Sequence, residues 1–151
     1  MSSIINKGWK LTKLVLPQHT DHARVMWHGS YINFLEEARI DALNKVGMSY
    51  SELSEKGFEI PVVSLNIKYK MSFNHGDKAL LISQFKMDNK IRLNCKTFFV
   101  KVNGDIAAEA LVGLVVVRKK NDSIKLIREL PDQIKNILLL LEEGPKIEMI
   151  E

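Results

Sequence analysis

The sequence has one cysteine, Cys95, among its 151 residues, which excludes a disulfide bond within the chain. Its longest apolar stretch runs from residue 106 to 117 and contains Glu109, so it falls short of the ~20 residues needed to span a bilayer. The first ten residues lack the charged and apolar segments of a secretory signal. We therefore expect no integral membrane segment and a reducing compartment, the cytoplasm.

The sequence also lacks a strong charge of either sign. It carries 22 Lys and Arg against 18 Asp and Glu, a formal net charge of +4, and no clustered basic face, so a nucleic-acid partner is not expected. Repeats, low-complexity tracts and linkers are absent as well. With 46% hydrophobic and 26% charged residues, the chain is typical of one globular domain over residues 1–151. We expect its core in residues 9–130 and a helical tail in 131–143.

The first half of the chain predicts a strand, an irregular loop and two helices. Alternating apolar and polar residues predict a strand over 9–16, and the loop over 17–28 carries three of the four histidines. Apolar residues at three- and four-residue spacing from Tyr31 to Val46 predict a long helix, with Ser30 as its N-cap and Gly47 just beyond its end. Ser49 followed by Glu52 predicts a second, short helix.

The second half of the chain predicts strands. Segments 62–71, 78–86, 91–102 and 106–118 are rich in β-branched, leucine or aromatic residues, and short polar turns separate them. The pair Asn103-Gly104 is a strong hairpin signal. The order predicts an α+β fold in which an antiparallel sheet of about five strands curls around one long helix.

The residues with the clearest potential for chemistry lie just before that helix. Asp21 stands in the loop, and a helix N-terminus offers unpaired backbone N–H groups that stabilise an anion. Acyl transfer requires such donors together with a carboxylate. A loop aspartate also commonly caps a turn, and the residues alone leave both interpretations open. His19, His22 and His28 lack a recognised metal-ligand spacing, so we expect no metal site.

A longer motif decides between these interpretations. Residues 21–39, Asp-His-Ala-Arg-Val-Met-Trp-His-Gly-Ser-Tyr-Ile-Asn-Phe-Leu-Glu-Glu-Ala-Arg, resemble the signature of the 4-hydroxybenzoyl-CoA thioesterase family, which includes the acyl-CoA thioesterases associated with the Tol-Pal cluster. The segments 47–53 and 61–69 and the Gly76-Asp77 turn are similar to that family too. The resemblance covers about residues 9–130 and implies the hotdog fold.

The resemblance also implies an activity, hydrolysis of an acyl-coenzyme A (acyl-CoA) thioester, and a role for particular residues. Asp21 matches the catalytic nucleophile or general base, and the backbone N–H of His28 matches the group that polarises the thioester carbonyl. Trp27 and Tyr31 match residues beside the acyl pocket. Lys90 and Arg92 lie where the family holds coenzyme A phosphates, although they also suit a solvated hairpin. Coenzyme A is part of the substrate, no cofactor is implied, and the expected assembly is a homodimer or homotetramer with the site at the subunit interface.

Two positions depart from the family pattern. Arg24 replaces a glycine and His22 replaces a small residue, so Arg24 becomes a candidate contact for an anionic part of the substrate. Two alternatives remain open: an acyl-CoA-binding or assembly module that has lost catalysis, and a hydratase of the same fold, for which the chain lacks the expected histidine before a Gly-Phe-Pro-type turn. The sequence does not indicate whether the acyl group is aromatic, short or long.

Overall fold

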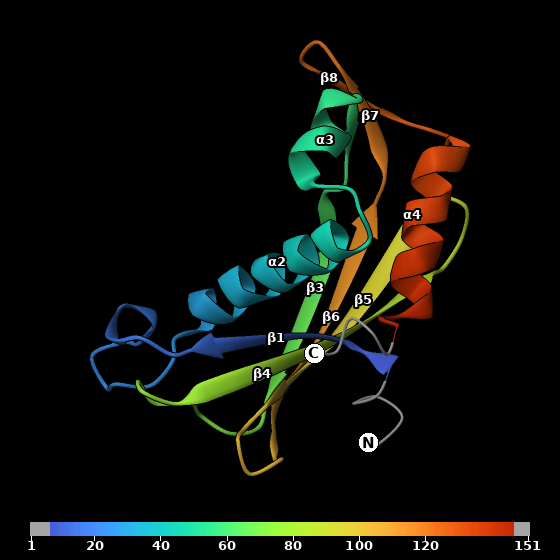
Figure 1. Ribbon diagram of the computed structural model, residues 1–151. Coiled ribbons are helices and arrows are strands. Elements are labelled where there is room, and N and C mark those ends of the chain that lie inside the picture. The colour runs from blue at the N-terminus through green and yellow to red at the C-terminus, as the bar shows by residue number, and fades with distance from the viewer. Residues whose placement is uncertain (1–6, 147–151) are drawn as a thin grey trace.

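A computed structural model describes residues 7–146 of the protein. Its main sheet has five antiparallel strands in the order β1-β4-β5-β6-β3, and α2 crosses one face of this sheet (Figure 1). A smaller sheet has the order β2-β7-β8, and its β7–β8 hairpin projects above the rest of the molecule (Figure 1). In chain order the elements are β1 Trp9–Leu14, η1 Pro17–His19, α2 His28–Lys45, α3 Tyr50–Glu55, β2 Phe58–Glu59, β3 Val62–Tyr69, β4 Lys78–Met87, β5 Arg92–Val100, β6 Ile106–Val115, β7 Val117–Lys120, β8 Ser123–Leu126 and α4 Asp132–Glu143.

The core lies between α2 and the inner face of the five-stranded sheet. Side chains alternate between the two faces of each strand, so Leu81, Phe99 and Val112 point inward and are almost completely buried. Phe34 and Leu35 of α2 pack against this layer and are 1% and 2% exposed. The antiparallel sheet and the long helix that covers it are confirmed, and burial of this apolar layer is the main force that holds them together.

The predicted start of the long helix was wrong by three residues. Helix α2 begins at His28 with Trp27 as its N-cap, so Ser30 lies inside the first turn. The Ser30 hydroxyl donates instead to the backbone carbonyl of His19 at 2.9 Å. This bond fixes the helix start to the preceding loop. The predicted helix end is confirmed, because Gly47 follows the C-cap at φ +94°, a conformation that glycine adopts without strain.

The short second helix is also confirmed, since the Ser49 side chain accepts a hydrogen bond from the Glu52 backbone N–H at 3.1 Å. The last predicted strand is instead two strands: β6 ends at Val115 and β7 begins at Val117 in the smaller sheet. Strands β2 and β8 were not predicted. The C-terminal helix is confirmed as α4, which packs on the main sheet. Within residues 7–146, no helix is both long and apolar enough to cross a bilayer.

Candidate active site

Asp21 lies in a tight turn that its own side chain stabilises. Its Oδ1 accepts a hydrogen bond from the Ala23 backbone N–H at 2.8 Å, and its backbone N–H donates to the carbonyl of Val25 at 2.9 Å. The turn-capping role that the sequence left open is therefore present. It occupies one carboxylate oxygen, and the structure gives Oδ2 no hydrogen-bond partner among the described residues. The turn holds the carboxylate in place and leaves one oxygen available for chemistry.

The turn requires an unusual backbone conformation at Arg24. Its φ is +67°, and within residues 7–146 only Arg24 and Asn121 among the non-glycine residues have a positive φ. Glycine adopts this conformation at little cost, whereas a side chain makes it unfavourable by roughly 1–2 kcal/mol. This conformation accounts for glycine at the corresponding position of the family signature. It also means that the arginine side chain, which is exposed, is present at a cost in stability.

The start of α2 lies beside this turn. Hydrogen bonds to the His19 carbonyl from the Trp27 backbone N–H, at 3.1 Å, and from the Ser30 hydroxyl connect the loop to the helix. His28 is the first residue of the helix, and its backbone N–H has no acceptor among the described residues. Such an N–H, at the positive end of the helix dipole, can donate to a developing oxyanion.

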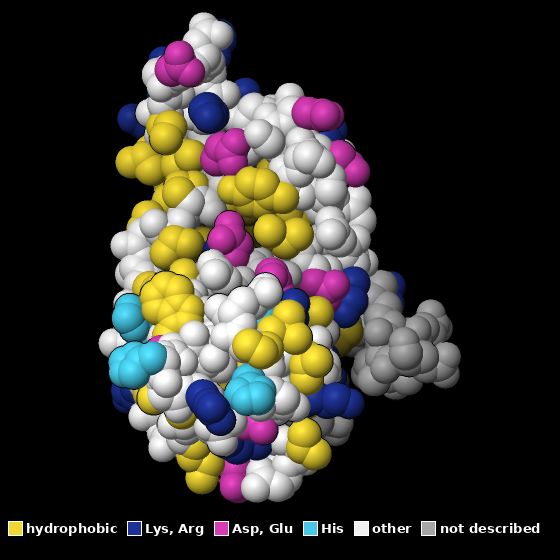
Figure 2. Space-filling view, turned by 90° about the vertical axis from the view of Figure 1, so that its left-hand side faces the viewer, with side chains coloured by type: hydrophobic (Ala, Val, Ile, Leu, Met, Phe, Trp, Pro, Cys, Tyr) yellow, Lys and Arg dark blue, Asp and Glu magenta, His cyan; other side chains and the backbone are white. Residues whose placement is uncertain are grey.

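Four of the predicted site residues line one pocket of about 350 Å³: Asp21, Trp27, His28 and Tyr31. Sequence reasoning missed the other residues that line this pocket, which are Met26, Tyr69, Lys70, Met71 and Ser72. Most of these residues lie at and beyond the end of β3. Figure 2 shows histidine side chains on the lower half of one face of the molecule, with hydrophobic side chains beside and above them. A substrate in this pocket would meet the carboxylate, the helix start and an aromatic wall together.

Tyr31 forms the buried floor of the pocket. It is 2% exposed, and its ring packs edge-on against Tyr69 at a centroid distance of 5.0 Å. It also packs at a tilt against the ring of Phe99, at a centroid distance of 5.1 Å. Burial, together with the nearby Tyr69, raises the pKa of Tyr31 to about 12. The phenol is therefore protonated at neutral pH, so it can donate a hydrogen bond but cannot act as a base.

Trp27 lies over the first turn of α2 in a position that only glycine at residue 29 permits. A Cβ atom added at Gly29 would lie 2.2 Å from the Trp27 ring. The indole is 43% exposed and lies edge-on to the His28 ring at 5.1 Å. Gly29 therefore positions an aromatic wall of the pocket. No signal in the sequence indicated this role, because with Ser30 as the predicted N-cap Gly29 lay outside the predicted helix.

The predicted residues Arg24, Lys90 and Arg92 do not line this pocket. Arg92 begins β5, whereas Phe99, which contacts Tyr31, lies seven residues further along the strand, roughly 23 Å at the usual strand rise. The Lys90 ammonium forms an exposed ion pair with Glu129 at 3.5 Å. The cation that does line the pocket is Lys70, which pairs with Glu109 at 3.1 Å. Within one copy of the chain, Lys90 and Arg92 lie at the far end of the sheet.

No group of three or more potential metal-ligating side chains is found in the part of the chain that the structure describes. The arrangement of the pocket instead suits an uncharged electrophile that becomes an anion during reaction, such as a carbonyl carbon attacked near the helix start.

Residues 15–138 match the thioesterase-like superfamily. The chain belongs to this superfamily. The antiparallel sheet with a long helix across it is the hotdog fold of these proteins, as the resemblance implied. This membership supports thioester hydrolysis as the class of activity of the protein.

Individual relatives agree with this membership. The chain is 29% identical over 144 residues to a putative esterase of Synechocystis, covering 95% of this chain and 86% of the relative. It is 25% identical over 114 residues to the putative acyl-CoA thioesterase YneP of Bacillus subtilis, covering 75% of this chain and 83% of that protein. A Staphylococcus aureus protein solved in complex with CoA shares the fold, with a TM-score of 0.80 at 15% identity and coverage of 93% and 88%.

Proposed function

We propose that this member of the superfamily hydrolyses acyl-CoA thioesters, with Asp21 as its catalytic carboxylate. The observation that carries the proposal is the convergence of Asp21, the unpaired N–H of His28 and the aromatic side chains of Trp27 and Tyr31 on one pocket. These residues match the family signature position by position. The 4-hydroxybenzoyl-CoA subfamily and a cytoplasmic location remain parts of the proposal.

The proposed reaction needs few groups because a thiolate leaves readily. Asp21 either attacks the thioester carbonyl directly or removes a proton from an attacking water molecule. The carbonyl oxygen becomes an oxyanion, which the His28 N–H stabilises; one such donor typically contributes roughly 2.7–4 kcal/mol to the transition state. The C–S bond then breaks, and the products are a free acid and the coenzyme A thiol. In the two-step route, water hydrolyses the acyl-aspartyl anhydride.

The coenzyme A part of the substrate carries phosphates, and we propose Arg24 as one of the cations that bind it. Arg24 is exposed, it has no carboxylate partner among the ion pairs of residues 7–146, and it lies three residues from Asp21. Guanidinium groups bind phosphate through two parallel hydrogen bonds. Lys90 and Arg92 remain candidates for the same role, and given their position they would act from a second copy of the chain.

We propose that the active form is a homodimer or a larger homo-oligomer. Strand β3 is an edge of the main sheet, and seven of its eight residues are exposed. Unpaired edges of this kind favour pairing with another strand. A second copy paired along β3 would cover the side of the pocket formed by Tyr69. Sedimentation equilibrium tests this directly: we expect a mass of at least twice the 17.3 kDa of the chain, and a monomer would contradict the proposal.

The activity is tested by release of free thiol from a panel of acyl-CoA substrates with aromatic, short-chain and long-chain acyl groups. We expect turnover of at least one class, with little hydrolysis of the matching oxygen esters. Binding of acyl-CoA without turnover would favour the binding-module alternative. Hydration of an enoyl-CoA without thiol release would favour the hydratase.

A further inference from the structure

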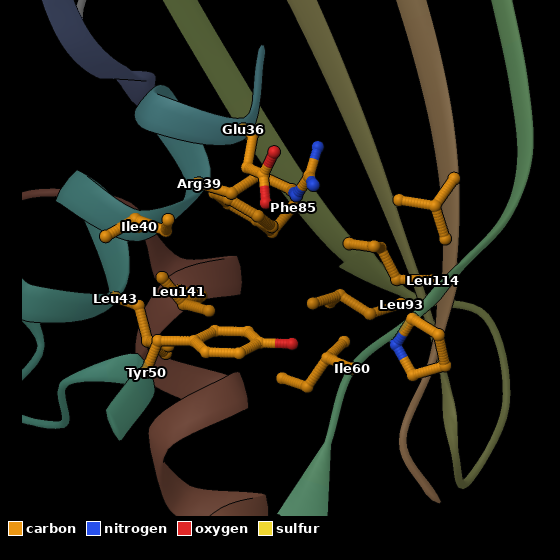
Figure 3. A pocket seen from close by; sticks show the side chains of 12 residues that line it. Glu36, Arg39, Ile40, Leu43, Tyr50, Ile60, Phe85, Leu93, Leu114 and Leu141 are labelled. Carbon is orange, nitrogen blue, oxygen red and sulfur yellow. The ribbon is translucent and has the colours of Figure 1, made fainter. Parts of the chain in front are cut away.

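A second cavity of about 210 Å³ lies along α2 from the candidate active site. Ile40, Leu43, Tyr50 and Leu141 form one wall, and Leu93 and Leu114 of the main sheet face them (Figure 3). Apolar cavities of roughly 150 Å³ are large enough to bind a molecule of benzene. This cavity therefore has room for several methylene groups, and its walls offer them apolar contacts.

One row of α2 side chains leads from the candidate active site to this cavity. His28, Ile32, Glu36 and Ile40 are spaced four residues apart, so they form a ridge in which each side chain is turned by about 40° around the helix from the one before it. His28 lines the first pocket, whereas Glu36 and Ile40 line the second. Ile32 lies between the two and is 43% exposed. The helix thus presents an exposed apolar side chain between the two pockets.

The inner face of β3 follows the same path on the opposite side. Tyr69 lines the first pocket, and Val62 lines the second. Leu65 lies between them, is 41% exposed, and is paired in register with the buried Val112, so it shares the inner face of the sheet. Exposed apolar side chains on both α2 and β3, between the two pockets, indicate a binding surface.

We infer that the second cavity binds the methyl end of a long, unbranched acyl chain whose thioester carbonyl lies at Asp21 and His28. The inference rests on the proposed function and adds the substrate class. Twelve residues separate His28 from Ile40, which corresponds to about 18 Å along the helix, the length of roughly fifteen bonds of an extended chain. The walls disfavour a charged chain end, because burying an unpaired charge there is costly.

Two charged residues lie at the end of the cavity nearer the active site (Figure 3). Glu36 is exposed and Arg39 is half-buried, and their side chains lie next to each other at this end of the cavity (Figure 3). An acyl chain would pass these two side chains before it reaches the part of the cavity that is lined mainly by apolar side chains.

The test compares how activity depends on acyl-chain length in the wild-type protein and in a variant that fills the cavity. The variant is Ile40→Trp, and Leu111→Trp is the matched control, because Leu111 is 51% exposed on the outer face of the sheet, away from the groove. The value of kcat/KM is measured for butanoyl-, octanoyl-, tetradecanoyl- and hexadecanoyl-CoA. Binding of the corresponding alkyl-CoA thioethers, which cannot be hydrolysed, is measured by calorimetry.

In the wild type we expect kcat/KM and thioether affinity to rise with chain length, by up to about fourfold per methylene buried. Ile40→Trp should reduce the ratio of tetradecanoyl to butanoyl activity at least about tenfold, and Leu111→Trp should leave this ratio unchanged. Val62→Trp, on the opposite wall, should repeat the effect and serves if Ile40→Trp does not fold.

A wild-type profile that is flat or favours short chains would overturn the inference. So would an equal loss at all chain lengths in Ile40→Trp, which would indicate that a second copy of the chain fills this groove. If no acyl-CoA is hydrolysed but thioether affinity still rises with chain length and falls in the variant, the proposed function fails while the chain-binding cavity stands.

Discussion

Replacement of Arg24 by glycine tests the strained turn beside the active site. The wild-type arginine at φ +67° costs roughly 1–2 kcal/mol relative to an unstrained conformation. Glycine removes this cost, but it also makes the unfolded chain more flexible, which lowers the free energy of unfolding by roughly 0.5–1 kcal/mol. Arg24→Gly should therefore raise the free energy of unfolding by about 0.5–1 kcal/mol, a rise in Tm of roughly 1–4 °C for a chain of this size.

Ala23→Gly is the matched control for this variant. Ala23 is exposed in the same turn and does not have a positive φ, so glycine there brings the entropic cost without relief of strain. We expect it to lower stability by roughly 0.5–1 kcal/mol. Urea denaturation of the three proteins measures the difference. If Arg24→Gly is destabilised as much as Ala23→Gly, the conformational reasoning is refuted.

The same variant separates strain from substrate binding. If Arg24 contacts the phosphates of coenzyme A, Arg24→Gly should raise KM for an acyl-CoA about tenfold or more, because hydrogen bonds between charged groups typically contribute roughly 1.5–3 kcal/mol. The corresponding acyl N-acetylcysteamine thioester has no phosphates, so its KM should change much less. An equal change for both substrates would exclude the proposed contact.

Two further predictions concern the pocket and the core around it. Burial raises the pKa of Tyr31 to about 12 and that of Cys95 to about 11, so the neutral forms stabilise the fold below pH 9 and this contribution is lost as pH rises from 9 to 12. Urea denaturation should show that the free energy of unfolding falls by a few kcal/mol over this pH range, and the fall should be smaller in Tyr31→Phe. An equal fall in that variant would contradict the role of Tyr31. Gly29→Ala should displace the Trp27 ring, which a Cβ would approach to 2.2 Å, and lower both Tm and kcat/KM; wild-type values for both would show that the indole is not fixed by this contact.

The helices could be predicted because their signals are local. The repeat of apolar residues gave α2, and Ser49, Glu52 and Gly47 marked ends that the structure confirms. The start of α2 was predicted incorrectly because serine is a common N-cap, whereas Ser30 here bonds to the distant His19 carbonyl. That contact depends on the path of the loop, which a local pattern does not describe.

The smaller sheet could not be predicted for a related reason. Strand β2 has two residues and β8 has four, too few for an alternating pattern to be recognised. Strand β2 exists because Phe58 and Glu59 pair with β7, almost sixty residues away. Long-range pairing of this kind overrides the weak preferences of short segments.

The candidate site also has a part that local sequence signals predict and a part that depends on long-range pairing. Asp21, Trp27, His28 and Tyr31 lie within eleven residues, so their spacing could be recognised and the structure brings them to one pocket. Tyr69 and its neighbours at the end of β3 complete the pocket only because Tyr69 and Phe99 are both paired with Ala108 in the sheet. This register is a property of the folded sheet, so the sequence alone gave no reason to include them.

The central claim is that Asp21 carries out thioester hydrolysis, and kcat of Asp21→Asn tests it most directly. The asparagine side-chain carbonyl can still accept the hydrogen bond from Ala23, so the turn should persist while the carboxylate is lost. We predict a fall in kcat of about 10²–10⁴-fold, the usual contribution of a positioned base, with coenzyme A affinity retained. Wild-type kcat in a folded Asp21→Asn variant would contradict the assignment.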